Sequence, residues 1–418
     1  MGAVVEAIVT SPAYVAAMIF LGVYPLASAV GWIGGSVAFS SRRERRAENA
    51  FYEIDARPPV SVVIPAHNEE AVIAETVASV LELDWPELEV VVVDDGSTDG
   101  TVRALERWSV EGAVRVIRKG VNEGKAMALD DAIPGLRGEI VLIVDADGRP
   151  DPAALRMMVP HFVHDPQVGA VTGNPRVSNT TTLLAKLQAI EFSATVSVLR
   201  RAQAAWGQLM TFSGICTALR TEAVASVGAF RPEMATEDIA LTWQLERAGY
   251  EVRYEPRAVF GMQVPETIGP WWRQRVRWAR GLGQVLRRNM PVMRTWRNRY
   301  LWPIYLEAAA STLWAHLFLA AIAVWALAFS LGIYHVGGDP VPDFWGMMIA
   351  SVGLVQIVWG LWLDGRHDAT ARRYALWAPL CPLAYWALDA AASIRATLAG
   401  FARPPRGTVV WGAARYRD

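Results

Sequence analysis

The sequence predicts an α/β domain with a doubly wound parallel sheet, inserted between transmembrane α-helices. Short β-branched runs alternate with helical segments from Val60 to about Val259, apolar runs flank this region, and acidic motifs follow two of the β-branched runs. A βαβαβ order builds a sheet whose ligand crevice lies at the carboxyl ends of its strands. The expected divisions are an N-terminal span with a basic flank (1–50), the α/β domain (51–265), an amphipathic interfacial segment (266–299), and further spans with a tail (300–418).

The first element is an apolar run from Tyr14 to Phe39, which carries no charged residue and is long enough to cross a bilayer. Four arginines follow it: Arg42, Arg43, Arg45 and Arg46. A cleaved signal peptide carries its positive charge before the apolar run. We therefore expect a retained span, with the arginines and the domain behind them in the cytoplasm. A solvated linker is the alternative for the arginine run, and it leaves the span in place.

The α/β region begins with two short β-branched runs, Val60 to Ile64 and Leu88 to Val93, which are typical of buried parallel strands. The segment between them, Ala71 to Leu81, has helical spacing. Two more strands are expected at Val114 to Ile117 and Ile140 to Val144, with Lys125 to Ala132 as a crossover helix. Acidic residues come directly after two of these strands, so we expect them at the ligand crevice.

Three further apolar stretches are expected as spans: Tyr300 to Tyr334, Phe344 to Leu363, and Tyr374 to Phe401. Arginines 366, 372 and 373 indicate that the loop after the second stretch is cytoplasmic. The number of spans places the tail outside, whereas Arg403, Arg406, Arg415 and Arg417 favour a cytoplasmic tail. Pro379 and Pro382 permit a break or a re-entrant turn in the last stretch, and both sides stay open for the tail.

The composition excludes several classes of protein. Lys and Arg number 40 against 41 Asp and Glu, so we expect no nucleic acid as a partner. A hydrophobic fraction of 53% and 18 Trp fit a protein with part of its mass in lipid. Two cysteines, Cys216 and Cys381, exclude a zinc cluster and a disulfide framework. His161 and His164 have no Cys or His beside them, so no metal site is expected there.

The loop from Asp94 to Gly100 follows the second strand, where a carboxylate such as that of Asp95 can accept hydrogen bonds from a nucleoside. A calcium loop is disfavoured, because no Glu closes the loop and a strand precedes it. Turn formation is the other alternative. Asn122 to Lys125 opens a helix whose N-terminus, together with Lys125, can meet a diphosphate. A simple helix start is the alternative there.

Asp145-Ala146-Asp147 places two carboxylates two residues apart on an extended segment, directly after a buried strand. Such carboxylates splay apart, and a hard divalent cation prefers their oxygen ligands. Thr236-Glu237-Asp238 precedes an amphipathic helix, where Asp238 can serve as a general base and helix capping is the alternative. Gln274, Arg277 and Trp278 lie on one helical face, suited to phosphate and sugar or, alternatively, to anionic lipid.

With these motifs in order, the chain resembles the membrane-bound inverting family 2 glycosyltransferases, whose fold is of the GT-A type and binds nucleotide sugars. Within this family it is most similar to the bacterial poly-β-1,6-N-acetylglucosamine synthases. The residues that carry this resemblance lie in six segments: Ala170 to Arg176, Ser213-Gly214, Met234 to Ile239, Tyr254 to Ala258, Pro265 to Thr267, and Gln274 to Trp278.

The resemblance implies a role for each matching residue. Asp95 would contact the uridine part of UDP, beside the diphosphate position already expected for Lys125, and Asp145 and Asp147 would bind Mg²⁺ or Mn²⁺ at that diphosphate. Asp238 would deprotonate the acceptor 6-hydroxyl. Arg277 would hold the diphosphate, and the acceptor site would comprise Ser213, Gly214, Glu237, Gln274 and Trp278. Glu307 and His316 are expected by position to face a channel for the product.

The resemblance also implies the partners: a UDP-sugar donor, UDP-GlcNAc; a growing polysaccharide acceptor; the lipid membrane; and a small membrane accessory subunit, which family members often use. The expected location is the inner (plasma) membrane, multi-pass, with the catalytic domain in the cytoplasm. Three alternatives stay open: another polymer such as hyaluronan, chitin or cellulose; a non-processive enzyme acting on a lipid carrier; and an inactive scaffold for polysaccharide export.

Overall fold

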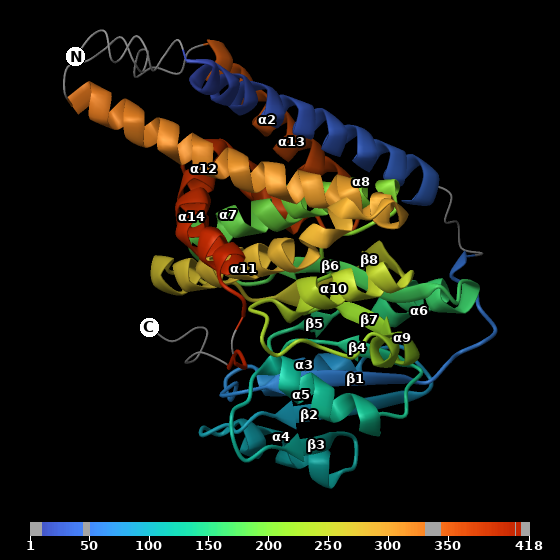
Figure 1. Cartoon of the computed structure of the whole chain (residues 1–418). Helices are drawn as coiled ribbons and strands as arrows, with labels where there is room; N and C mark the ends of the chain where they lie inside the picture. The colour runs from blue at the N-terminus through green and yellow to red at the C-terminus, as the bar shows by residue number, and fades with distance from the viewer. Residues whose placement is uncertain (1–10, 45–50, 331–343, 406, 411–418) are drawn as a thin grey trace.

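The computed structural model of the chain describes residues 11–44, 51–330, 344–405 and 407–410. Figure 1 shows the α/β domain at one end, three long helices (α2, α12 and α13) at the other, and α11 with α14 between them. Several positions named above lie outside the described residues: Arg45, Arg46, Tyr334, Arg406, Arg415 and Arg417.

The predicted parallel strands form one half of the sheet. They are β1 (Val60–Ala66), β2 (Leu88–Asp94), β3 (Arg115–Arg118) and β4 (Ile140–Ile143), in the spatial order β3-β2-β1-β4. β1 pairs in parallel with β2 from Val60↔Leu88 to Ala66↔Asp94, and with β4 from Val60↔Ile140. This arrangement brings the carboxyl ends of β1, β2 and β4 to one edge, which is the edge where the acidic motifs begin.

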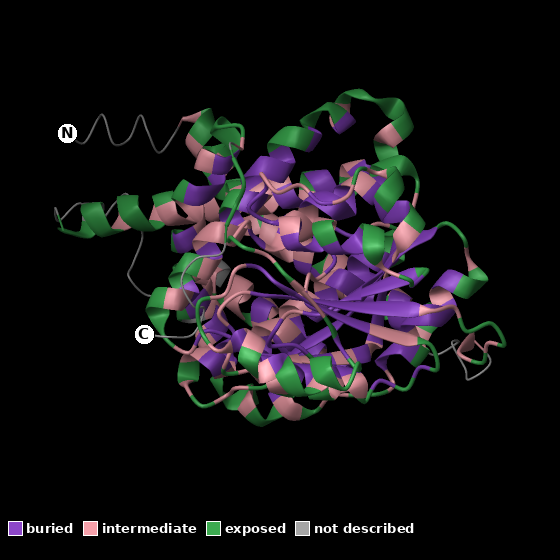
Figure 2. Ribbon diagram, turned by 90° about the horizontal axis from the view of Figure 1, so that it is seen from below, coloured by how far each residue is buried: buried purple, intermediate pink, exposed green. Residues whose placement is uncertain are grey.

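Both faces of this half are covered by helices. Along β1 and β2, alternate residues enter two separate hydrophobic cores, Val62 and Val92 on one face and Val63 and Val91 on the other. Figure 2 shows the strands buried throughout the centre of the domain. Burial on both faces explains why the strands are continuous apolar runs and not alternating ones. The helices of the first core include α3 (Ile73–Leu81), α4 (Thr101–Val110) and α6 (Ala154–His164); those of the second include α5 (Lys125–Ala132), α9 (Thr221–Ser226) and α10 (Glu237–Ala248).

The other half of the sheet is mixed, and the parallel pattern ends at β4. The complete order is β3-β2-β1-β4-β7-β6-β8-β5, with β5 (Arg149–Pro150), β6 (Val168–Val177), β7 (Thr217–Arg220) and β8 (Glu251–Met262). β7 is antiparallel to both β4 and β6. The chain enters β7 from the loop that contains Ser213 and Gly214, which lies at the crevice, so the strand runs away from the crevice. The fold is thus the predicted α/β class of GT-A type, with a mixed sheet.

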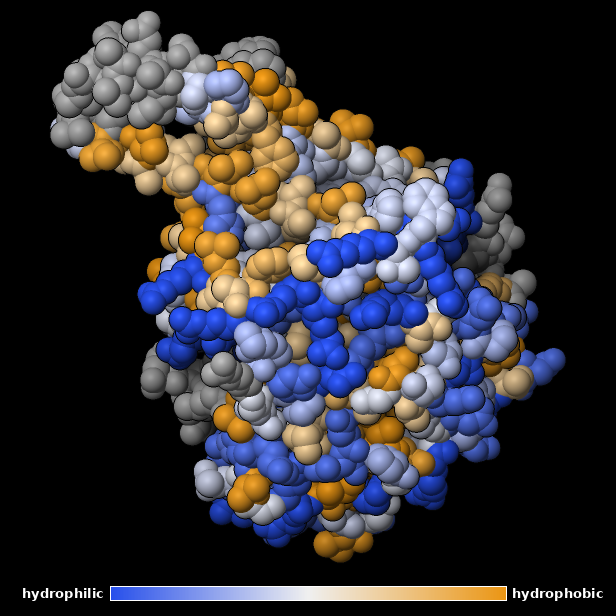
Figure 3. Space-filling view, in the orientation of Figure 1, coloured by the Kyte–Doolittle hydropathy of each residue, from blue (hydrophilic) through white to orange (hydrophobic). Residues whose placement is uncertain are grey.

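Three helical segments among the described residues are long and apolar enough to cross a membrane: Pro12–Glu44, Trp296–Leu327 and Gly346–Asp364. They overlap with α2 (Pro12–Phe39), α12 (Trp302–Ser330) and α13 (Phe344–Asp364), respectively. Figure 3 shows apolar surface over this end of the molecule and hydrophilic surface over the domain. α2 contacts both α12 and α13. Trp314 Nε1 of α12 donates to Leu21 O at 3.0 Å, and Trp359 Nε1 of α13 donates to Ser36 Oγ at 2.9 Å.

The last apolar stretch, expected as a span from Tyr374 to Phe401, is instead broken. It consists of two short turns, Thr370–Trp377 and Cys381–Tyr385, followed by α14 (Trp386–Ala402), a helix of 17 residues. α14 packs along α11 (Ile268–Asn289) so closely that a Cβ on Gly400 would lie 2.2 Å from Arg280 O. Prolines break the stretch, and the contact with α11 holds its last helix against the domain.

A buried ionic cluster joins α13 to the α/β domain. Asp364, at the end of α13, is 0% exposed and accepts hydrogen bonds from Ser197 Oγ at 2.7 Å and Arg201 Nη1 at 3.1 Å. Arg176 on β6 forms a third contact with the same carboxylate. Both arginines compensate for the cost of burying this charge, so α13 is held in a defined position relative to β6 and α8 (Ser197–Trp206).

Candidate active site

The side chain of Lys125 brings together groups from several elements at the carboxyl ends of the parallel strands. Its Nζ is 2.5 Å from Asp145 Oδ1, 3.3 Å from Glu237 Oε1 and 3.1 Å from Gly214 O. These groups come from the start of α5, the end of β4, the start of α10 and the loop before β7. We call Lys125, Asp145, Gly214 and Glu237 the Lys125 cluster. It joins four of the predicted site residues, which lie far apart in the sequence.

Asp238 lies beside this cluster at the first turn of α10. A Cβ on Gly214 would be 3.7 Å from Asp238 Oδ2 and 2.9 Å from Lys125 Nζ, so an alanine there would displace the ammonium group of Lys125. Burial, and after it the charge of Glu237, raises the pKa of Asp238 to about 6, while Lys125 and Arg277 lower it. A carboxylate with a pKa near neutrality is suited to accept a proton.

The structure does not support the alternative in which Thr236 caps the helix. Thr236 occupies the N-cap position of α10, but its side chain makes no capping hydrogen bond. Its hydroxyl instead faces α11, where a Cβ on Gly281 would be 2.1 Å from Thr236 Oγ1. α11 is therefore packed directly against the segment that carries Glu237 and Asp238.

Hydrogen bonds to its carbonyl groups hold the backbone of the Asp145-Ala146-Asp147 motif in place. Thr76 Oγ1 donates to Ala146 O at 2.6 Å, Gly148 N donates to Asp145 O at 2.8 Å, and Asp147 is buried. The carboxylate oxygen atoms of Asp145 and Asp147 fit a hard divalent cation. Among the residues that the structure describes, no three His, Cys, Asp or Glu side chains come close enough to hold a metal ion by themselves. A cation bound here would therefore complete its coordination with other oxygen ligands, such as those of a phosphate.

Asp95 is 0% exposed and holds the loop that opens α5. Its carboxylate accepts hydrogen bonds from Gly124 N at 2.7 Å and Glu123 N at 3.0 Å. Gly124 has a φ of 89°, which favours glycine. The C-terminal segment crosses the same loop, since Val409 N donates to Pro232 O at 2.8 Å and a Cβ on Gly124 would be 2.0 Å from Val409 O. Contact of Asp95 with a nucleoside stays a prediction.

A second polar group lies at the end of β1 and is not among the predicted site residues. His67 Nδ1 is 2.8 Å from Asp95 O, and its Nε2 is 3.1 Å from Asn68 Nδ2 and 3.2 Å from Asn122 Nδ2. A carbonyl oxygen only accepts, so Nδ1 carries the hydrogen and Nε2 accepts from the amides. The signal in the sequence is a run of polar residues directly after a buried strand.

The remaining predicted residues are held by neighbouring elements. Ser213 N donates to Thr172 Oγ1 at 3.0 Å, which fixes the loop that carries Gly214. Arg277 Nη1 donates to Ala235 O at 3.4 Å. Trp278 is half-buried in the next position of α11, and its ring lies 4.8 Å from the guanidinium of Arg275. Gln274 is half-buried one turn earlier on the same helical face.

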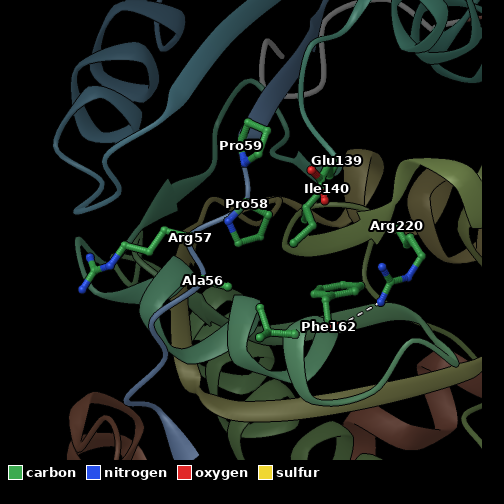
Figure 4. Close-up of a pocket in the computed structure, with 9 residues that line it drawn as sticks. Ala56, Arg57, Pro58, Pro59, Glu139, Ile140, Phe162 and Arg220 are labelled. Atoms are coloured by element: carbon green, nitrogen blue, oxygen red, sulfur yellow. Dashed lines mark hydrogen bonds between the residues drawn. The ribbon is translucent and has the colours of Figure 1, made fainter.

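A surface pocket of about 430 Å³ lies at the opposite end of the sheet (Figure 4). Its lining includes Pro59 and Ile140, where β1 and β4 begin, and Arg220, where β7 ends. The Arg220 guanidinium donates to Phe162 O at 2.9 Å and Val168 O at 3.1 Å, so backbone carbonyls already satisfy it. The chemistry-bearing side chains are at the other end of these strands, and the pocket is not part of the candidate active site.

Comparison with known proteins agrees with this arrangement. The sequence profile of the family described as glycosyltransferase like family 2 matches residues 58–281. The poly-beta-1,6-N-acetyl-D-glucosamine synthase of Staphylococcus epidermidis is 31% identical over 400 residues, which cover 94% of this chain and 97% of the relative. The synthase of the same name from Staphylococcus aureus (strain COL) is 31% identical over 408 residues, with the same coverage of 94% and 97%.

A solved structure gives a similar result. The mannosyltransferase PcManGT from Pyrobaculum calidifontis, in complex with GDP-Man and Mn²⁺, superposes with a TM-score of 0.57 at 26% identity. The match covers 87% of this chain and 99% of that one. The mixed sheet, the crevice at the carboxyl ends of β1, β2 and β4, the matched profile and the full-length relatives lead to one conclusion. The chain belongs to glycosyltransferase family 2.

Proposed function

We propose that this chain is a processive inverting β-glycosyltransferase that polymerises N-acetylglucosamine from UDP-GlcNAc into β-1,6-linked poly-N-acetylglucosamine. The observation that carries the proposal is the Lys125 cluster. Its ammonium group pairs with the carboxylates of Asp145 and Glu237, directly beside the candidate base Asp238. The choice of polymer is supported by the names of the Staphylococcus relatives, which align over 94% of the chain. The proposed domain boundaries lie after residues 50, 265 and 299, as expected from the sequence.

The donor would bind across the ends of β2, β4 and α5. Asp95 and the polar group around His67 would face the uridine, and Lys125 and Arg277 would face the diphosphate. Lys125 forms ion pairs with Asp145 and Glu237, so it lies where a diphosphate would meet the carboxylates. Asp145 and Asp147 would hold Mg²⁺ or Mn²⁺, as the Mn²⁺ of PcManGT suggests. Such a cation offsets the charge that develops on a departing diphosphate.

Asp238 would act on the acceptor. With a pKa of about 6, its carboxylate is ionised at neutral pH and can take the proton of the sugar 6-hydroxyl. The activated oxygen attacks the anomeric carbon on the face opposite UDP, which converts an α-linked donor into a β-linked product. Lys125 and Arg277 stabilise the negative charge of the leaving diphosphate, an electrostatic contribution that is usually large. Ser213, Gly214, Glu237, Gln274 and Trp278 would line the acceptor site.

The membrane part would keep the product close to the active site. Three candidate spans flank the domain, and Arg42, Arg43 and Arg372 lie at their domain-side ends. By the excess of positive charge in cytoplasmic loops, this supports a multi-pass protein of the inner (plasma) membrane with a cytoplasmic catalytic domain. The enzyme would also help to move the growing chain across the membrane, together with a small membrane accessory subunit.

The test is UDP release by the purified full-length protein in detergent with Mg²⁺ or Mn²⁺. UDP-GlcNAc, UDP-glucose and UDP-GlcNAc with UDP-glucuronate are supplied separately, and D238N serves as the inactive control. The proposal expects release with UDP-GlcNAc alone, and a loss of about 10²–10⁴ in rate for D238N. Release with a different donor only would overturn the polymer and leave the mechanism. Equal release by D238N would overturn the role of the base.

A further inference from the structure

Arg275 lies within the Gln274–Trp278 motif, yet it is assigned no role in the reaction. It is buried, at 5% exposure, and its side chain contacts a polar group that is separate from the Lys125 cluster. Its Nη1 is 2.7 Å from Glu191 Oε1 and its Nη2 is 2.5 Å from Glu191 Oε2. Two parallel hydrogen bonds of this kind fix the plane of the guanidinium.

Tyr385 closes this cluster from a third element. Arg275 Nη2 donates to Tyr385 Oη at 2.8 Å, and Tyr385 Oη donates to Glu191 Oε2 at 2.7 Å. Trp271 Nε1 donates to the same hydroxyl at 3.2 Å, and Asp389 Oδ1 is 3.4 Å from Arg275 Nη1. We call Arg275, Glu191, Tyr385 and Asp389 the Arg275 cluster. It connects α11 to the π-helical turn Glu191–Val196, to the turn Cys381–Tyr385 and to α14.

The guanidinium of Arg275 lies over three aromatic rings, of which Trp278 is the nearest, with Trp271 at 5.5 Å and Tyr385 at 5.8 Å. The Arg275 guanidinium lies 4.8 Å from the centroid of the Trp278 ring, three residues further along α11. A planar guanidinium can bind carboxylate oxygens with its edge and stack on a ring with its face at the same time, which a lysine ammonium cannot do. The hydrogen bonds of the edge therefore determine the plane against which the Trp278 ring rests.

We propose that Arg275, held by Glu191 and Tyr385, is a positioning residue that fixes the Trp278 ring as the platform for the acceptor sugar and so determines product length. The inference rests on the proposed function, because it takes Trp278 as the acceptor platform. A fixed ring stacks on the terminal sugar without first losing side-chain freedom, so the polymer stays bound between additions. If the Trp278 ring is not fixed, the polymer dissociates sooner from the enzyme, and shorter chains result.

The Arg275 cluster shares no residue with the groups proposed to meet the donor diphosphate and its metal ion, Lys125, Arg277, Asp145 and Asp147. The Lys125 cluster is built by α5, β4, α10 and the Gly214 loop, and none of its four members belongs to the Arg275 cluster. A change at Arg275 should therefore alter product length while UDP affinity is retained. A purely structural defect would lower both.

The experiment compares full-length wild type, R275K, W278A and the double variant R275K/W278A, with UDP-GlcNAc and Mn²⁺. Product length is measured by gel electrophoresis, and UDP affinity by calorimetry. We expect R275K to shorten the product roughly threefold to tenfold, the size of a lost cation–π contact, with UDP affinity changed by less than about twofold. In the W278A background the same substitution should have no further effect. R273K, at an exposed arginine of the same helix, is the matched control.

Y385F removes one hydroxyl and keeps the ring, so it gives the same test if R275K does not fold; a smaller shortening is expected. Unchanged product length in R275K would overturn the proposal, as would equal shortening in both backgrounds. If W278A makes full-length product, Trp278 is not the acceptor platform, and the proposal is overturned. The absence of polymer from wild type with every UDP-sugar would refute the proposed function itself, an outcome distinguishable from the others.

Discussion

The pKa of Asp238 predicts how the activity depends on pH. Burial and Glu237 raise this pKa from 3.8 to about 6. If Asp238 is the base, the fraction of enzyme with an ionised carboxylate falls to about one tenth at pH 5, so kcat/KM should fall about tenfold between pH 8 and pH 5. The pH dependence of kcat/KM reports the pKa values of the free enzyme.

The assay is UDP release at low UDP-GlcNAc between pH 5 and pH 8, with the melting temperature measured at each pH to exclude unfolding. K125M removes the cation that lowers the Asp238 pKa, so its acid limb should move to higher pH. R273K should keep the wild-type profile. A flat profile down to pH 5 in wild type, or an acid limb that K125M leaves in place, would refute the reasoning.

The raised pKa of Asp238 also has a consequence for stability, and its sign can be checked with D238N. The folded protein binds the proton more tightly than the unfolded chain, so stability falls as pH rises between about 4 and 6. At pH 7 the ionised carboxylate costs the folded state at most ~3 kcal/mol, because each tenfold difference in proton affinity corresponds to about 1.36 kcal/mol. D238N should therefore lose activity and melt at the same temperature as wild type or higher. A lower melting temperature would contradict the raised pKa.

Three further predictions concern Gly214, Glu246 and the divalent cation. G214A places a Cβ 2.9 Å from Lys125 Nζ, so the rate of UDP release should fall roughly 10–100-fold with little change in melting temperature; a wild-type rate would show that Lys125 need not stay there. Burial raises the pKa of Glu246, whose Oε1 accepts from Leu209 N at 2.7 Å, so stability should fall as pH rises through that pKa. E246Q keeps the acceptor and should melt near wild type without this pH dependence, whereas E246L leaves a buried N–H unpaired and should lose ~1–3 kcal/mol. EDTA should stop UDP release and Mn²⁺ or Mg²⁺ restore it; release that persists in EDTA would exclude a cation from the reaction.

The parallel half of the sheet could be predicted from the sequence because both its faces are buried. Runs such as Val90 to Val93 are apolar at every position for that reason, and they mark the strands clearly. The other half is less visible, since β6 contains Pro175 and β8 contains Pro256, residues that argue against a strand. Their pairing depends on contacts across the sheet, which periodicity along one strand does not contain.

Some of the apolar helices could likewise be predicted from the sequence, and one could not. The candidate spans that overlap with α2, α12 and α13 can be identified from apolar length alone. The last stretch has similar composition but packs on α11 through Gly400 and Gly283, where a Cβ on Gly283 would lie 2.2 Å from Thr397 O. Hydropathy does not distinguish a helix buried in protein from a helix buried in lipid.

In the candidate site, the positions of the carboxylates could be predicted, whereas their partners could not. Acidic residues after buried strands must lie at the crevice, which located Asp95, Asp145 and Asp147. The contacts of Lys125 with Asp145, Glu237 and Gly214 join segments up to about 110 residues apart, and no local pattern encodes them. The engagement of Asp95 with the N–H groups of the loop before α5 is likewise a tertiary contact.

The most direct test of the central claim is the linkage of the product made by the full-length enzyme from UDP-GlcNAc and Mn²⁺. The polymer is treated with a β-1,6-specific glucosaminidase and, in parallel, with a chitinase, and D238N provides the blank. Complete digestion by the first enzyme and none by the second is the predicted result. A polymer that only chitinase digests would contradict the claim of β-1,6 polymerisation.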